Sequence, residues 1–461
     1  MRYPVYPEYK ESGVQWLGQV PEHWEVKRLK DVGSLMAGAG FPHEFQGIED
    51  EKYPFFKVGD LANSSDGRKM IRGEHSISRK TASILRARII PPNAIIYAKI
   101  RAALLLNRRR ITAIPCCIDN NMTAFVPTAG KIDTTFSFYW FSTLDFGEFT
   151  NPGAVPSLSE GYQSILPITL PPLPEQTAIA NFLDRETGRI DTLVAKKRRL
   201  IALLKEKRTV LISRAVTRGL PASVAREFGL EPHTRFKDSG IEWLGQVPEG
   251  WEVKKLGFIT KKIGSGKTPS GGAETYVDEG IMFLRSQNVY DEGLNLEDVV
   301  YIDEGTDADM ATSRVQPKDI LLNITGASLG RTCIVPDEFS RANVNQHVCI
   351  IRMSNLKHSV FISWLMKSAG IKAQIQNAQT GAAREGLNFE QITNLVFVLP
   401  LLSEQTAIAT YLDRETAKID RLVEKVELLI SRLQEYRAAL ITATVTGKID
   451  VRSCTSQEVS T

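Results

Sequence analysis

The sequence contains one module twice, and this duplication limits the possible folds more than any other feature. KESGVQWLGQVPEHWEVKRL at residues 10–29 returns as KDSGIEWLGQVPEGWEVKKL at 237–256, with 15 of 20 positions identical. EQTAIANFLDRETGRIDTLV at 175–194 returns as EQTAIATYLDRETAKIDRLV at 404–423, again with 15 of 20 positions identical. The two offsets are 227 and 229 residues, so each half has nearly the same length between its opening and closing segment. A whole module has therefore been duplicated.

The segments between the repeats have diverged but keep a common pattern. An apolar run breaks into a polar loop at 53–67 and again at 281–293. CIDNNMTAFVP at 117–127 and NVNQHVCIIRM at 343–353 each place an Asn-containing polar turn before a strand-like run. The pattern predicts two globular mixed α/β domains on one plan, with different surfaces.

Composition indicates a folded globular protein. At 461 residues the chain exceeds one ordinary core, and its 43% hydrophobic and 24% charged residues are typical of globular domains. No apolar run approaches the roughly 18 residues of a membrane span, and the start does not resemble a signal peptide, so we expect a cytoplasmic protein without membrane contact. The five cysteines have no CxxC spacing, which argues against a disulfide framework or a thiolate zinc site.

Each closing repeat predicts the start of a long helix. No proline lies between Pro174 and Pro221, and none follows Pro400. Both stretches can therefore run about 40 residues as helix, roughly 60 Å at 1.5 Å per residue. A short helix would be explained by an amphipathic stripe on a domain core, but a core is not 60 Å long. We expect the two helices to pack on each other, antiparallel if a pseudo-twofold axis relates the halves.

Apolar residues along these helices follow the 4-3 spacing of a coiled-coil seam. The seam of the second helix is predicted at Ile408, Leu412, Ile419, Leu422, Val426, Leu429, Leu433, Tyr436 and Leu440, with Glu415 as an interruption. The first helix keeps Ile179, Leu183, Ile190, Leu193, Leu200, Leu204 and Leu211 but adds Glu186, Lys197 and Lys207. From these we select Ile179, Leu183, Ile190, Ile408, Leu412, Ile419 and Leu429 as residues for helix packing and partner binding.

Motifs of catalysis are missing from the sequence. GSGKTPS at 264–270 resembles a phosphate-binding loop, but Lys261 stands where that motif needs its first Gly, and Pro269 lies where its helix should begin. No Asn/Asp-Pro-Pro-aromatic loop of an amino methyltransferase occurs, and the six histidines form neither HExxH nor HxH. PDE at 336–338 lacks the spaced ExK of a nuclease. The sequence predicts a chain without an active site or a cofactor of its own.

Basic residues cluster in the variable regions, although the net charge is only +4. Arg101 lies near three consecutive arginines at 108–110, and Lys261, Lys262 and Lys267 open the second variable region. A single charge run is usually a solvated face. Basic clusters in both halves, beside loops rich in Asn, Gln, Ser and Thr, favour contact with DNA.

These repeats resemble those of the specificity (S) subunit of type I restriction-modification enzymes. The resemblance rests on WLGQVPEHWEV and WLGQVPEGWEV, on LPPLPEQTAIANFLDRET and LPLLSEQTAIATYLDRET, and on the helix tails LISRAVTRG and LITATVTGKIDV, and it covers essentially the whole chain. It implies an α+β fold with two target-recognition domains joined by two long antiparallel helices, each domain binding half of a bipartite DNA site. The predicted boundaries are 1–172 and 237–402 for the domains, 173–218 and 403–447 for the helices, 219–236 for a linker and 448–461 for a tail.

The resemblance also implies partners. Two methyltransferase (M) subunits would dock on the helices, and motor-nuclease (R) subunits would join them. Adenine methylation and ATP-dependent cleavage, with S-adenosylmethionine, ATP and Mg, would belong to these partners. The helices would set the spacing between the half-sites.

We select eleven candidates for DNA contact from the variable regions, each of which could instead cap a turn or pair with a surface carboxylate. They are Lys57, Arg101, Arg108 and Arg110 in the first domain, and Lys267, Thr268, Arg285, Gln287, Asn288, Asn323 and Arg331 in the second.

Three alternatives remain open from the sequence. One is the specificity chain of a restriction system that cuts on both sides of its site. Another is a duplicated coiled-coil scaffold that binds only proteins, without salt-dependent affinity for DNA. A stand-alone enzyme is the third, and it would require activity in the purified chain.

Overall fold

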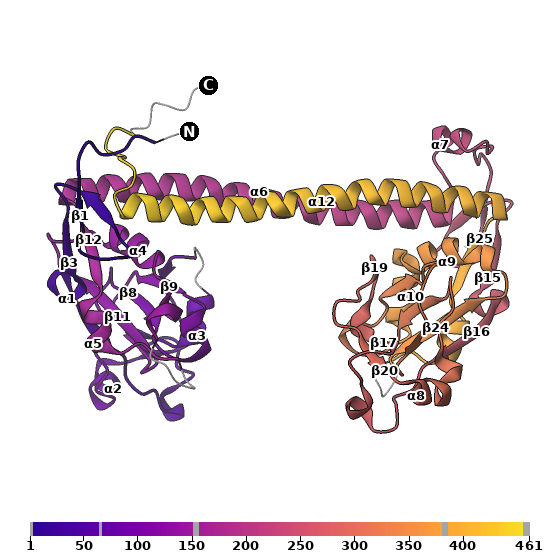
Figure 1. Ribbon diagram of the computed structural model, residues 1–461, viewed down its shortest axis with the longest axis horizontal. Helices are drawn as coiled ribbons and strands as arrows, with labels where there is room; N and C mark the ends of the chain where they lie inside the picture. Colours follow the sequence, from indigo (N-terminus) through magenta and orange to yellow (C-terminus); the bar gives the residue numbers. More distant parts are fainter. Residues whose placement is uncertain (1–2, 64–66, 151–155, 380–385, 455–461) are drawn as a thin grey trace. The chain divides into compact units, whose positions relative to one another are not determined.

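The computed structural model describes residues 3–63, 67–150, 156–379 and 386–454 (Figure 1). The chain forms two compact units. Unit 1 consists of Met1–Lys197 together with Leu428–Thr461, and unit 2 consists of Arg198–Glu427. Each unit therefore contains one globular domain and half of each long helix.

Unit 1 contains a five-stranded sheet and a smaller three-stranded sheet. The larger sheet has the strand order β4 (Gly33–Ala37), β11 (Met122–Pro127), β8 (Ile95–Ala98), β9 (Arg109–Thr112) and β6 (Lys69–Met70). The smaller sheet has the order β10 (Cys117–Ile118), β5 (Tyr53–Phe56) and β7 (Ser76–Ile77). The helices α1 (Leu29–Val32), α2 (Arg79–Ile84), α3 (Arg101–Leu105), α4 (Thr134–Ser142) and α5 (Glu160–Ile165) connect or cover the strands.

Unit 2 repeats this arrangement, except that its larger sheet has no strand equivalent to β6 among the described residues. Its larger sheet has the order β16 (Thr260–Ser265), β24 (Val348–Met353), β21 (Ile320–Asn323) and β22 (Thr332–Ile334), and its smaller sheet β20 (Val300–Ile302), β17 (Ile281–Leu284) and β23 (Ala342–Val344). Its shorter helices are α7 (Ala222–Glu227), α8 (Glu304–Asp309), α9 (Ser359–Met366), α10 (Ala369–Asn377) and α11 (Phe389–Thr393). The predicted internal duplication and mixed α/β class are confirmed.

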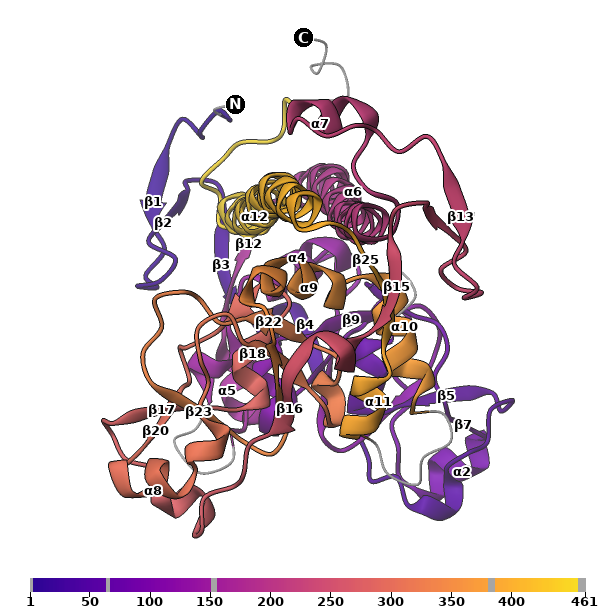
Figure 2. The same cartoon turned by 90° about the vertical axis from the view of Figure 1, so that its right-hand side faces the viewer.

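The opening repeats lie next to the long helices in both units. Strand β3 (Glu25–Arg28) pairs with β12 (Pro167–Leu170), and β15 (Glu252–Lys255) pairs in the same way with β25 (Val396–Leu399). In unit 2, β15 and β25 lie near α12, whereas β17, β20 and α8 lie at the end away from the helices (Figures 1 and 2). A hairpin precedes each pair, β1 (Tyr9–Glu11) with β2 (Gln19–Pro21) and β13 (Phe236–Asp238) with β14 (Gln246–Pro248).

The two repeated stretches meet through a buried carboxylate. Glu175 is 7% exposed and accepts hydrogen bonds from Trp24 Nε1 at 3.1 Å and Tyr6 Oη at 2.6 Å. In unit 2, Glu404 accepts from Trp251 Nε1 at 2.9 Å. A carboxylate in the first helical turn is also favoured by the helix dipole. The sequence is repeated because each unit uses it to fix a domain to the start of a helix.

The long helices are α6 (Leu173–Arg218) and α12 (Leu402–Val445), and within each unit their segments lie side by side (Figures 1 and 2). In unit 1, Arg437 on α12 bonds to Asp191 on α6 at 2.9 Å. In unit 2, Arg208 on α6 bonds to Asp420 on α12 at 3.1 Å. Within unit 1, Thr169 just before α6 donates to the carbonyl of Val445 at the end of α12, whereas Asp191 further along α6 bonds to the earlier residue Arg437, so the helices are antiparallel as predicted.

The seam between the helices differs from the predicted one. Leu422 and Leu429 are 43% and 44% exposed, whereas Val426 is 4% exposed. Ile430 and Leu433, and not Leu429, pack against the core of unit 1. From Leu422 onwards, every second position of the predicted α12 seam therefore lies one residue too early, and the residue after Leu422 and the residue after Leu429 take these places. The same shift applies to α6, where Leu193 is 41% exposed and Val194 is 7% exposed.

The other selected packing residues lie in the cores. Ile179, Leu183 and Ile190 are buried in unit 1, and Ile408, Leu412 and Ile419 are buried at the matching places in unit 2. A glycine with positive φ follows each helix, Gly219 at 81° directly after α6 and Gly447 at 73° two residues after α12, and such glycines are common at helix C-termini. Within the described residues, no helix is long and apolar enough to cross a membrane.

Candidate nucleic-acid interface

Equivalent strands in the two units end in equivalent loops. The register shows this, because Phe55 pairs with Cys117 in unit 1 as Phe283 pairs with Asn343 in unit 2. Four loops meet at this edge in each unit. They follow β4 and β16, β5 and β17, and β8 and β21, and they precede β11 and β24.

The Gly-Lys loop of the sequence follows β16. Gly266 lies where an added Cβ would meet the carbonyl oxygen of Val344 at 1.6 Å, and Gly38 in unit 1 has the same close approach to Asp119 at 1.9 Å. The neighbouring backbone passes so close to each glycine that a side chain of any size would clash with it. The next residues of unit 2, Lys267 and Thr268, are exposed. The loop offers a cation and a hydroxyl without being a nucleotide-binding motif.

A 3-10 turn follows the central strand of each smaller sheet. Lys57 opens the turn in unit 1, and its backbone N–H donates to Asp60 Oδ2 at 2.6 Å. Arg285 opens the turn in unit 2, and its N–H donates to Asn288 Oδ1 at 2.9 Å. The fold thus places a cation at the same position of both units.

A third loop presents Arg101 in unit 1. Arg101 has φ of 62°, and the equivalent position of unit 2 is Gly326 with φ of 70°. A non-glycine residue in this region costs of order 1–3 kcal/mol. Its side chain is exposed. Strained residues of this kind concentrate at functional sites, which favours the predicted role of Arg101.

The fourth loop, which we name the tip turn, comprises residues 119–121 in unit 1 and 345–347 in unit 2. Asp119 is 7% exposed and accepts from the backbone N–H of Asn121 at 2.8 Å. Asn345 is 9% exposed and accepts from the N–H of His347 at 3.1 Å. The middle residues, Asn120 and Gln346, are exposed. A buried first residue therefore closes each tip turn, and the exposed middle residue carries an amide.

Backbone bonds tie each tip turn to its neighbours. In unit 1, Asp119 N–H donates to Phe56 at 3.0 Å and Lys99 N–H donates to Asn121 at 2.9 Å. The same two bonds recur in unit 2 at 3.0 Å each, from Asn345 to Leu284 and from Ile324 to His347. The loops after β5 and β8, and after β17 and β21, are therefore in direct contact with the tip turns.

A side-chain network supports the tip turn of unit 2. Thr268 Oγ1 donates to Gln346 Oε1, and Gln346 Nε2 lies 3.0 Å from His347 Nε2. His347 Nδ1 lies 2.6 Å from Thr325 Oγ1. The network orients the Gln346 amide and joins three of the four loops.

Burial changes the ionisation of carboxyls below these loops. The pKa of Asp119 is raised by burial, although backbone N–H groups and the Lys57 charge oppose the shift. Burial also raises the pKa of Asp60, against the hydrogen bond from Lys57 N–H. These carboxyls support the loops from inside and do not face solvent.

The structure separates the predicted contacts of unit 1. Arg101 and Arg108 are exposed, and Lys57 is half-buried with Nζ 3.1 Å from Gln46. Arg110 is half-buried and donates to the carbonyl of Arg109 at 2.7 Å. Arg109, between them, is 7% exposed, and burial lowers the pKa of its guanidinium to about 10. Lys57 and Arg101 belong to the four loops, whereas Arg108 and Arg110 lie at β9.

In unit 2, Lys267, Thr268, Arg285 and Gln287 belong to the loops. Asn288 is 1% exposed and its Nδ2 donates to Asn295 at 2.9 Å, so both ends of its amide bind the backbone. Asn323 is fully buried, and its Nδ2 donates to Ser286 at 2.7 Å. These two asparagines hold the loops in place and offer no exposed group.

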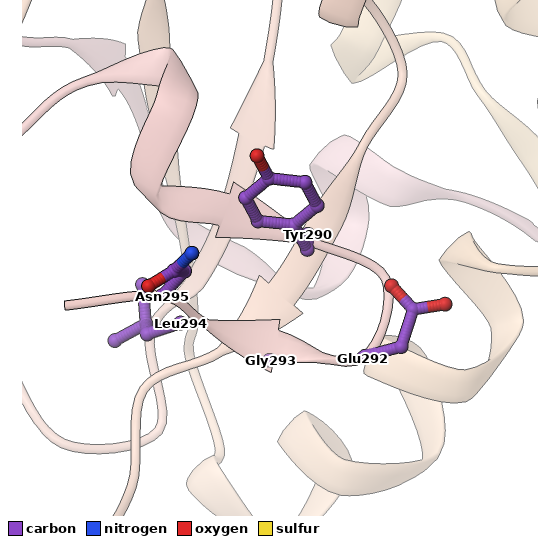
Figure 3. A pocket seen from close by; sticks show the side chains of 5 residues that line it. All are labelled: Tyr290, Glu292, Gly293, Leu294 and Asn295. Carbon is purple, nitrogen blue, oxygen red and sulfur yellow. The ribbon is translucent and has the colours of Figure 1, made fainter. Parts of the chain in front are cut away.

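Arg331 is the last residue of the loop between β21 and β22, and it lies beside a shallow hollow. Its guanidinium lies 4.6 Å from the ring centre of Tyr290. Tyr290, Glu292 and Asn295 surround the hollow, whose volume is about 280 Å³, on the hairpin of β18 (Val289–Tyr290) and β19 (Gly293–Leu294) (Figure 3). Glu292 adds a negative charge that opposes phosphate binding in this hollow, and Arg331 stays a predicted contact.

The sequence prediction did not select Asn120, Gln346, His347, Thr325 or Lys99. The sequence signals Asn120, Gln346 and His347, because the polar turns before the strands at 117–127 and 343–353 match between the halves, whereas Thr325 and Lys99 lie outside these segments. Which residue of each turn is exposed depends on the strand register. In the described part of the chain, no group of three His, Cys, Asp or Glu side chains could hold a metal ion.

Comparison with known proteins agrees with this geometry. The sequence matches the type I restriction modification DNA specificity domain twice, over residues 21–201 and 248–428. The MjaIX specificity subunit of Methanocaldococcus jannaschii is 24% identical over 458 residues, which cover 96% of this chain and 97% of that protein. The EcoBI specificity subunit of Escherichia coli is 24% identical over 292 residues, which cover 61% of this chain and 58% of that protein.

A solved structure shares the fold. It comes from work on complex assembly and conformational transition of the type I R-M system, and it matches with a TM-score of 0.66 at 17% identity, covering 92% of this chain and 98% of that chain. The two matched domains together span most of the sequence. This chain therefore belongs to the family of type I restriction-modification DNA specificity subunits and carries two DNA recognition domains.

Proposed function

We propose that this chain binds a bipartite DNA target, one half-site to each unit, and directs partner methyltransferase and motor-nuclease subunits to that DNA. The observation that carries the proposal is the recurrence of the four loops, with a cation at Lys57 and Arg285 and an amide at Asn120 and Gln346. Arg and Lys bind guanine edges or phosphates, and amides bind adenine. These are the groups that sequence-specific DNA binding needs.

The helices provide a surface for a partner. Leu428, Leu429 and Tyr436 on α12 are 52%, 44% and 48% exposed within unit 1. Leu429 and Tyr436 are seven residues apart and so lie on one face of the helix. Exposed apolar residues gathered on one face favour a protein contact. We assign this face to an M subunit.

Catalysis is assigned to the partners. Adenine methylation with S-adenosylmethionine, and ATP- and Mg-dependent cleavage, would occur on the M and R subunits, in the cytoplasm. On this chain, the loop that resembles a nucleotide site is shaped by the approach of Gly266 to Val344. The chain would thus contribute recognition and assembly.

Three measurements test the proposal. The full-length chain with its M partner should select a bipartite motif from a randomised duplex library, and its affinity should fall as salt rises. The purified chain alone should neither methylate nor cleave DNA. Binding without any sequence preference would favour the scaffold alternative, and activity of the chain alone would favour a stand-alone enzyme.

A further inference from the structure

The tip turns keep one chemical feature while their surroundings differ. Asn120 and Gln346 both carry a primary amide at the exposed centre of the turn. Around them, Ala39 and Gly40 of unit 1 correspond to Lys267 and Thr268 of unit 2, as the pairing of β4 with β11 and of β16 with β24 shows. Both tip turns therefore carry an amide, although the residues of the neighbouring loop are small in unit 1 and polar or charged in unit 2.

The geometry allows both amides to face a ligand from a rigid support. The residue that precedes each amide residue, Asp119 or Asn345, is buried, and its side-chain oxygen closes the turn by accepting a hydrogen bond from the backbone N–H two residues later. The backbone N–H of that residue is bonded to the end of the central strand, from Asp119 to Phe56 and from Asn345 to Leu284. A fixed backbone reduces the entropy lost when the side chain binds.

The amide of Gln346 has bonding capacity left after its internal contacts. Its oxygen accepts one bond from Thr268, and its nitrogen lies within hydrogen-bond distance of His347. A primary amide has two N–H donors and two lone pairs, so one donor and one acceptor remain. The major-groove edge of adenine presents the complementary pair, the N7 acceptor and the N6 amino donor.

We propose that Asn120 and Gln346 are the specificity-determining residues for one adenine in each half-site. This inference rests on the proposed function and assigns it to two named side chains. His347 and Thr268 act as positioning residues, because they orient Gln346 through hydrogen bonds. Lys57 in unit 1 and Arg285 in unit 2 each lie on the turn that adjoins the tip turn of their own unit, and each binds neighbouring groups of the half-site of that unit.

The test is selection from a randomised duplex library by the full-length chain in complex with its M partner. Gln346→Ala should lower the preference for adenine at one position by about 5- to 150-fold and leave the other half-site unchanged. Asn120→Ala should do the same in the other half-site. Gln346→Glu should move the preference at that position towards cytosine, because a carboxylate accepts from the cytosine amino group and cannot donate to N7.

The matched control is Gln376→Ala, which removes an exposed amide on α10 of the same unit. It should select the wild-type motif, and thermal melting should show that all variants fold. An unchanged motif in both the Asn120 and Gln346 variants would overturn the inference and leave the proposed function intact. A uniform loss of affinity without a change in motif would also overturn it, because that result marks a phosphate contact. If the wild-type complex itself selected no motif, the proposed function would fail first.

Discussion

The indole N–H of Trp24 donates to the carboxylate of Glu175 at 3.1 Å, joining two segments 151 residues apart in the sequence. His23 Nε2 lies 2.8 Å from the other oxygen of the same carboxylate. Trp251 and Glu404 repeat the bond at 2.9 Å. The duplicated sequence is therefore a joint between the opening strand and the helix, made once in each unit.

Removing the carboxylate of this joint should destabilise one unit. Glu175→Ala leaves Tyr6 Oη and Trp24 Nε1 buried without an acceptor, and each such group costs about 1–3 kcal/mol. We expect the free energy of unfolding of unit 1 to fall by about 2–6 kcal/mol. Calorimetry that resolves the two units would measure it. Glu175→Gln keeps an acceptor and should lose less, and equal losses in both variants would contradict the explanation.

The ion pairs between the helices should set their register while adding little stability. Asp420 is 42% exposed and its partner Arg208 is 15% exposed. A pair with one exposed member contributes about 0–1 kcal/mol and weakens with salt. Asp420→Ala should therefore lower the free energy of unfolding by about 1 kcal/mol or less. In a double-mutant cycle, the charge-swapped pair Asp420→Arg with Arg208→Asp should recover stability that Asp420→Arg alone loses. No coupling at low salt would refute the pairing.

Lys267 should contribute to DNA affinity through charge. It is exposed on the loop after β16, beside Thr268. Lys267→Ala should weaken binding of the complex and reduce the slope of log affinity against log salt by about 1, because one phosphate contact is lost. Lys357→Ala removes an exposed lysine beyond the other end of β24 and should leave the slope unchanged. Equal effects of the two substitutions would indicate only a general charge effect. Mobility shifts over a salt series would measure both.

Asp119 makes a contribution to stability that depends on pH. Burial raises the pKa of this carboxyl, so the folded state holds the proton more tightly than the unfolded state. The resulting stabilisation is complete below the ordinary pKa of about 3.9 and is lost as pH rises through the folded value. Asp119→Asn keeps the Oδ1 acceptor for Asn121 and removes the buried charge.

The melting temperature of Asp119→Asn relative to the wild type should therefore increase as pH rises from about 4 and then level off. The fold accepts this residue, because unit 2 already has Asn345 at the equivalent position. A difference between variant and wild type that does not change with pH would contradict the burial of this charge.

The sequence predicted the duplication and the paired helices because both depend on repeated patterns. It could not choose the seam, since Leu422 is followed by Val423 and Leu429 by Ile430, and either member of each pair satisfies a 4-3 spacing. In the corrected seam, Arg437 occupies one of the seam positions, where its charge is neutralised by Asp191. A search for apolar residues cannot find such a position.

The site was harder to predict for a related reason. Asn323 ends β21 and Asn288 lies in the turn after β17, where the sequence predicted base contacts, but their amide nitrogens donate to backbone carbonyls. Asn120 lies between Asp119 and Asn121, which hold the turn. Only the strand register, which depends on residues distant in sequence, determines which of these amides is exposed.

The corrected seam separates helix packing from partner binding at adjacent residues. Leu429 is 44% exposed, and Ile430 packs against the core of unit 1. Leu429→Asp should leave the melting temperature nearly unchanged, because an exposed site tolerates a charge. It should reduce assembly with the M subunit at least tenfold, because a carboxylate would be buried in an apolar contact.

Ile430→Asp is the matched control on the neighbouring face. It should lower the free energy of unfolding by about 2–4 kcal/mol, since it places an unpaired charge against the core. Calorimetry and co-purification with the M subunit would measure the two effects separately. If Leu429→Asp assembled normally, the exposed face of α12 would not be the docking surface. If it destabilised unit 1 as much as Ile430→Asp, Leu429 would belong to the seam after all.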